Sequence, residues 1–197
     1  MDTDDRRSSP LADTSGKLCT SALYAVLKSR GAEAGSANSA FWRSCAPPRV
    51  QFFGWLLVHG RVQCKTSLLQ RKVVQDSTRE LRNREPETAS HLIFHCAFAA
   101  SFWQTLGFQL PATLGVQDIH QLPRPDTIPA THFDTFVLLC CWQLWKRRNG
   151  IIFKQETMSL RQTMQVCKHE ATLWRCRLPR PDRSLVDQWC SVFSLSM

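Results

Sequence analysis

The sequence predicts a mainly α fold, a small irregular helical domain with few or no strands. Apolar residues recur at helical spacing in several stretches, and glycines, prolines or basic turns end these stretches. β-Branched runs are few, and no Asn-Gly turn separates alternating apolar segments. The 197 residues include seven Trp and eleven Phe, enough for a hydrophobic core without disulfide bonds.

Composition shifts along the chain divide it into five regions. Polar residues lead, a Gly, Ala and Ser-rich stretch follows, and four prolines later separate two apolar parts. The predicted regions are a disordered N-terminal lead (1–16), a short helix with a flexible linker (17–40), a globular domain (41–107), a Pro-rich connection (108–130) and a C-terminal helical region (131–197).

Two apolar segments of the globular domain are expected to form its main helices. Pro48 suits the first turn of the earlier helix, where no N–H is needed, and Gly60 ends it. Thr88 or Ser90 can cap the later helix, which is expected to stop at Gly107.

Two more helices are expected in the C-terminal region. The first spans about 130–148, and its last turn, Lys146-Arg147-Arg148, complements the negative end of the helix dipole before an Asn149-Gly150 cap. The second spans 159–177, and a short segment around Trp189 is expected to pack back on the core.

Charge and cysteine usage restrict the class of protein. The net charge of +9 favours a polyanionic partner such as RNA or DNA. The sequence has no secretory signal and no apolar run long enough to cross a bilayer. We therefore expect an intracellular protein, nuclear or cytoplasmic, whose nine cysteines are reduced and mostly buried, with no membrane or small-molecule partner.

Residues 78–103 combine a charged loop with an apolar helix that carries His91, His95 and Cys96. Imidazole and thiolate are the usual ligands of tetrahedral structural zinc. This loop-plus-helix element is therefore zinc-knuckle-like. His91 and Cys96 are five residues apart, about 140° around an α-helix, so an irregular turn is needed if both are to reach one metal ion.

A combined motif extends beyond this element. It consists of Trp42, A-P-P-R-V-Q-F-F-G-W-L-L-V-H-G-R-V (46–62), Leu68, E-T-A-S-H-L-I-F-H-C (87–96), Phe98 and Trp103. The motif closely resembles the zinc-binding region of plant non-LTR retrotransposon reverse transcriptases (LINE-like elements). W-Q-L-W-K-R-R-N-G-I-I-F (142–153) is similar to a segment that commonly follows that region. The resemblance covers roughly residues 13–155 and implies a part in positioning template nucleic acid.

The zinc pattern of that family, C-x2-C-x8-H-x4-C, is only half present. His91 and Cys96 match its second half, whereas Arg79 and Arg82 occupy the two cysteine positions. Arginine stays protonated and repels a dication, so we expect the zinc site implied by the resemblance to be lost.

The alternative is that other ligands replace the missing cysteines. His95 lies four residues after His91, about 40° around a helix, so both can face one metal ion. Cys64 can contribute from a neighbouring loop.

Basic residues of the same region have two interpretations. They can contact nucleic-acid phosphates, since guanidinium groups bind phosphate oxygens in pairs. The simpler alternative, which we favour, is a solvated loop that nearby glutamates partly neutralise. The candidates are Arg71, Lys72, Arg79, Arg82 and Arg84. Trp55, Trp103, Trp142 and Trp145 can likewise stack on bases, but their helical spacing favours the core.

Catalytic signatures are missing. A reverse transcriptase needs paired aspartates for two metal ions, and the only tyrosine, Tyr24, is followed by Ala-Val-Leu. No nucleophile elbow is present, so no enzyme is expected. The sequence predicts a non-catalytic remnant of a retrotransposon reverse transcriptase, a zinc-binding-like domain with residual nucleic-acid binding. The alternative is a degenerate or repurposed helical protein-interaction domain without metal or nucleic acid.

Overall fold

A computed structural model describes residues 21, 25–26, 41–64, 78–79, 83–157 and 159–195. The predicted lead, most of the short helix and linker, and the basic residues Arg71, Lys72 and Arg82 lie outside these residues. Within them, no helix combines the length and the apolar character that crossing a membrane requires.

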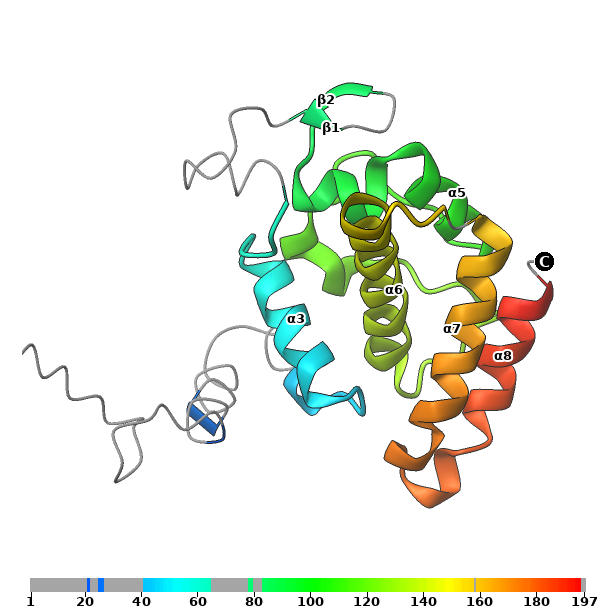
Figure 1. Cartoon of the computed structure of the whole chain (residues 1–197). Helices are drawn as coiled ribbons and strands as arrows, with labels where there is room; N and C mark the ends of the chain where they lie inside the picture. Colours follow the sequence, from blue (N-terminus) through cyan, green and yellow to red (C-terminus); the bar gives the residue numbers. More distant parts are fainter. Residues whose placement is uncertain are drawn as a thin grey trace, which may run out of the picture.

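Helix α6 (Phe133–Lys154) is the centre of the described fold. Helix α3 (Pro48–Val58) packs on one side of it and α7 (Leu160–Trp174) on another, while α8 (Leu185–Leu195) lies alongside α7 (Figure 1). The mainly α fold is confirmed. The shorter elements are β1 (Thr78–Arg79), β2 (Asn83–Pro86), the π-helical turn η1 (His91–His95), α5 (Ala97–Thr105), and the 3-10 turns η2 (Val116–Gln121), η3 (Arg175–Arg177) and η4 (Arg180–Asp182).

A small antiparallel hairpin is the β structure of the described residues. β1 and β2 pair Thr78 with Pro86 and Arg79 with Asn83, with an irregular register between the two pairs. The hairpin precedes η1 in the chain and lies at one end of the molecule (Figure 1).

Helix α3 begins and ends as its sequence predicts. Pro48 occupies its first turn, and Gly60 follows its C-terminal end with a positive φ of 62°. Later in the chain, the expected single helix from residue 88 or 90 to 106 is wrong. The backbone becomes extended at Cys96 (φ −67°, ψ 148°), which separates η1 from α5. Thr88 nevertheless acts as the expected cap, since its Oγ1 accepts a hydrogen bond from the His91 N–H at 3.0 Å.

Helix α6 continues past its predicted end, so the expected Asn149-Gly150 cap is wrong. The helix extends to Lys154, and the left-handed residue that ends it is Gln155 (φ 56°). A glycine inside a helix costs roughly 1 kcal/mol relative to alanine, but burial of this part of α6 offsets that cost. Gly150 and its neighbour Arg148 are both buried.

The C-terminal helices pack against α6 as predicted. Ser159 and Gln162 form a capping box at the start of α7. On α8, Trp189 and Phe193 are fully buried against Phe136, with ring centroids 5.7 and 5.2 Å apart.

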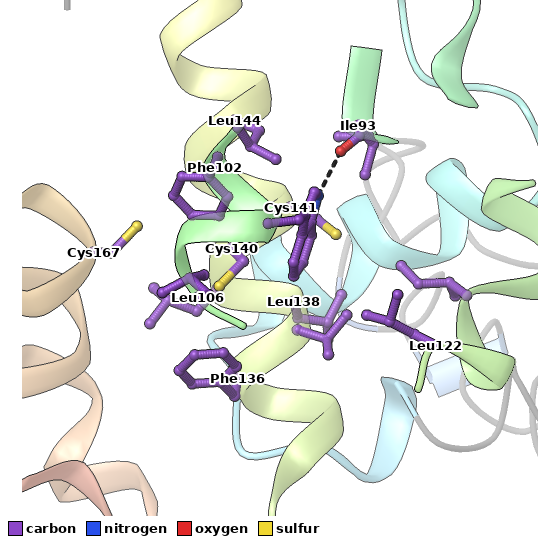
Figure 2. Packing of buried hydrophobic residues seen from close by; sticks show 14 of the residues in the cluster. Ile93, Phe102, Leu106, Leu122, Phe136, Leu138, Cys140, Cys141, Leu144 and Cys167 are labelled. Atoms are coloured by element: carbon purple, nitrogen blue, oxygen red, sulfur yellow. Dashed lines mark hydrogen bonds between the residues drawn. The ribbon is translucent and has the colours of Figure 1, made fainter. Parts of the chain in front are cut away.

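The Pro-rich segment contributes directly to the core. It contains η2 and buries a set of aliphatic side chains that are each at most 5% exposed, Leu114, Val116, Ile119, Leu122 and Ile128. Figure 2 shows Leu122 among the packed side chains around α6. Segment 108–130 is therefore part of the packed domain as well as a connection.

The crossing of α3 and α6 depends on Gly54. A Cβ at this position would lie 2.6 Å from Leu138 Cδ2 and 3.2 Å from a Phe41 ring carbon. We expect Gly54→Ala to lower the free energy of unfolding by about 1–3 kcal/mol, because overpacking forces the helices apart. Urea denaturation measures the change.

Gly150→Ala is the matched control for this substitution. Its added Cβ would meet mainly the flexible end of Glu156, while the substitution improves helix propensity. We expect it to be neutral or to stabilise by up to about 1 kcal/mol. Equal effects of the two substitutions would contradict the close crossing at Gly54.

Candidate zinc half-site and aromatic groove

The π-helical turn brings the ends of the H-x4-C motif together. The Cys96 N–H donates to the His91 carbonyl at 2.7 Å, a hydrogen bond between residues five apart. The irregular turn that a shared metal ion requires is therefore present. His91 is 8% exposed and Cys96 is 5% exposed.

The Cys96 thiol occupies the N-cap of α5. Its Sγ accepts a hydrogen bond from the Ala99 N–H at 3.3 Å and lies 3.8 Å from the Leu92 carbonyl oxygen. These contacts satisfy a backbone donor that the helix leaves without an intrahelical partner. In this arrangement Cys96 stabilises the start of α5.

Within the described residues, no third ligand joins His91 and Cys96. His95 Nε2 lies 2.8 Å from the Leu114 carbonyl, to which it donates a hydrogen bond. Across the described ranges, which include Cys64, no group of three or more His, Cys, Asp or Glu side chains can hold a metal ion. The donors present at His91 and Cys96 are half a site and do not fit a structural zinc ion by themselves.

The predicted basic loop remains a prediction. Arg79 lies in β1 and Arg84 in β2, whose backbone alone is described, and the other three candidates lie outside the described residues. The hairpin register places Arg79 opposite Asn83.

The Lys146-Arg147-Arg148 cluster lies inside α6, so its interpretation as a solvated dipole complement is wrong. Arg148 is buried and donates to both carboxylate oxygens of Glu87, from Nη2 at 2.5 Å and from Nε at 3.3 Å. The Arg147 guanidinium lies 3.4 Å from the Phe98 ring centroid, and Lys146 pairs with Glu170 at 3.2 Å. The buried pair ties the end of the loop to the central helix.

Trp103 belongs to the core, as predicted. Its side chain is fully buried, and its indole N–H donates to the Ile93 carbonyl at 2.7 Å, the dashed contact in Figure 2. The other three candidate tryptophans, Trp55, Trp142 and Trp145, are only half-buried.

A groove of about 480 Å³ lies between α3 and α6. Trp142 and Trp145 stack at 5.0 Å, and the buried Phe53 contacts both rings at 5.2 and 5.4 Å. The residues that line the groove are Arg49, Phe52, Phe53, Leu56, Arg61, Val62, Gln63, Trp142 and Trp145. Sequence reasoning missed this groove because its two walls are far apart along the chain.

The structure defines a helical domain in which a π-helical turn brings His91 and Cys96 close together. Residues 19–103 match the family described as zinc-binding in reverse transcriptase. This match confirms, for residues 19–103, the resemblance that the combined motif predicts. No curated protein and no solved structure matches the chain.

Proposed function

We propose that this chain is a non-catalytic derivative of a reverse transcriptase that binds single-stranded nucleic acid in the groove between α3 and α6. The observation that carries the proposal is a groove with an aromatic wall and two arginines, and with no carboxylate among its lining residues.

The aromatic wall suits unpaired bases. Stacking of a base on an aromatic side chain contributes about 1–3 kcal/mol and requires no particular sequence, because every base has a π face. Phe52, Trp142 and Trp145 are half-buried, so each keeps part of its ring surface exposed in or beside the groove.

The charge around the groove suits a polyanion. Residues 41–64 contain Arg43, Arg49 and Arg61 and no Asp or Glu. Arg49 and Arg61 are exposed, and no carboxylate of the described residues forms an ion pair with either. Arg61 lies over the Trp55 ring at 5.5 Å, which orients its guanidinium beside the groove.

A second groove, of about 390 Å³ between α6 and α7, is less suited to phosphate. Its cations are already neutralised in part, since Lys146 pairs with Glu170 at 3.2 Å and Lys154 with Glu156 at 3.7 Å. The groove between α3 and α6 is therefore the preferred nucleic-acid site.

Zinc has no part in the proposed function. His91 and Cys96 keep the geometry of half a site, while the family positions of the other two ligands hold Arg79 and Arg82. The Cys96 cap and the packing around η1 replace the metal as the support of this segment.

Fluorescence anisotropy with a labelled single-stranded RNA of mixed sequence tests the proposal. We expect binding that weakens steeply with added salt. The double variant Arg49→Gln/Arg61→Gln should weaken binding roughly tenfold at moderate salt and reduce the slope of log affinity against log salt by about 1.4, for two lost phosphate contacts.

The matched control is Arg161→Gln/Arg180→Gln, which removes the same charge from exposed positions remote from the groove. This control should lower affinity only slightly. Equal losses in both double variants would refute the groove. No binding by the wild-type chain at low salt would refute nucleic-acid binding altogether and leave a helical protein-interaction domain.

A further inference from the structure

Three side chains from distant parts of the sequence form a connected line on the described fold. Cys45 Sγ lies 3.7 Å from Nδ1 of His132, and Nε2 of the same imidazole lies 2.9 Å from Oδ2 of Asp182. Cys45 precedes α3, His132 precedes α6 and Asp182 ends η4. The order thiol, imidazole, carboxylate is that of a nucleophile, its base and the group that orients the base.

The backbone around Cys45 is held from two sides. The Cys45 N–H donates to Thr135 Oγ1 at 3.0 Å, and Arg177 Nε donates to the Cys45 carbonyl at 3.1 Å. Thr135 is fully buried, so this anchor belongs to the core. The thiol is therefore fixed relative to α6 rather than carried on a free loop.

His132 is held in an uncommon conformation. Its φ of 58° and ψ of 27° are left-handed, a region that a residue with a Cβ enters at a cost of about 1 kcal/mol. In this conformation both ring nitrogens of His132 contact side chains outside α6, Nδ1 that of Cys45 and Nε2 that of Asp182.

The carboxylate of Asp182 decides which nitrogen carries the proton. An ionised carboxylate only accepts hydrogen bonds, so Nε2 of His132 must be the donor in this contact. In the neutral ring Nδ1 is then the acceptor, and it faces the Cys45 thiol. The imidazole is thus arranged to remove the thiol proton.

We propose that Cys45 is a nucleophilic modification site for α,β-unsaturated carbonyl compounds, with His132 as its base and Asp182 as the positioning residue. The thiol proton moves to Nδ1 as Sγ forms a bond to the β-carbon of the electrophile. The electron pair of the carbon–carbon double bond moves to the α-carbon, which takes the proton from His132. The product is a thioether, and no leaving group or oxidant is required.

The remaining thiols give an internal comparison. Cys176 is more exposed than Cys45, yet its thiol contacts a backbone carbonyl, that of Leu173 at 3.6 Å. Burial raises the pKa of Cys45, and the nearby Arg177 opposes this rise, so the resting thiol is protonated and needs a base. Burial also raises the pKa of Cys140, Cys141 and Cys167, which keeps these core thiols unreactive.

Acrylamide labelling of the full chain, followed over time by peptide mass mapping, tests the proposal. Exposure alone predicts faster labelling at Cys176. We expect Cys45 to react at least about tenfold faster than Cys176. A positioned base contributes at least about a hundredfold to proton transfer in favourable sites. His132→Gln should remove this advantage and leave the Cys176 rate unchanged.

Asp182→Ala gives a second, independent variant. It should reduce the Cys45 rate by a smaller factor, because the base remains but its ring is free to turn. Labelling at the core thiols reports any unfolding of either variant. A wild-type Cys45 rate at or below that of Cys176 would overturn the proposal, and so would an unchanged Cys45 to Cys176 ratio in both variants.

Discussion

Arg148→Ala is expected to lower the free energy of unfolding by about 3–5 kcal/mol, because it removes the positive charge of Arg148 from the buried Glu87 carboxylate. The side chains of Arg148 and Glu87 are 4% and 0% exposed, and two hydrogen bonds join them. Arg148 also donates to Asn149 Oδ1 at 3.1 Å. Urea denaturation followed by circular dichroism measures the loss.

Two further variants separate charge from packing. Arg147→Ala changes the neighbouring arginine, whose contact with the Phe98 ring is worth about 0.5–1 kcal/mol. Glu87→Gln/Arg148→Met removes both buried charges while it keeps similar volumes, and it should recover much of the stability lost in Arg148→Ala. If Arg148→Ala costs no more than Arg147→Ala, the buried pair is not a main support of the fold.

The second large effect concerns zinc. Arg79→Cys/Arg82→Cys completes the pattern C-x2-C-x8-H-x4-C with His91 and Cys96, which the π-helical turn brings close together. We expect the double variant to gain zinc-dependent stability, about 4 kcal/mol when free zinc exceeds its dissociation constant a thousandfold. Thermal unfolding with and without zinc, together with metal analysis, measures this gain.

The controls for zinc use the same chain. The wild type should show no shift in melting temperature with zinc and should not purify with one equivalent. Adding Cys96→Ser to the double variant should remove the gain, since only three of the four ligands that structural zinc needs would remain. One equivalent of zinc in the wild type, or no shift in the double variant, would show that the ligand geometry differs from the family pattern.

Local signals predicted the elements that local physics controls. Pro48 and Gly60 bound α3 because proline suits a first helical turn and glycine accepts a positive φ. Thr88 and Ser159 cap their segments through side-chain oxygens close in sequence. Where tertiary contacts compete with these signals, the predictions failed, as at Gly150, which lies within α6 instead of ending it.

The sequence by itself determined the resemblance of residues 19–103 to the zinc-binding region of reverse transcriptases, the mainly α class, and the presence of arginine at positions 79 and 82, because these follow from residue identity and short spacing. Only the tertiary structure decided which distant side chains meet. It joined Glu87 to Arg148, placed Phe53 against two tryptophans of α6, and aligned Cys45, His132 and Asp182. Burial and helix crossing create these contacts, and no periodicity or local motif encodes them.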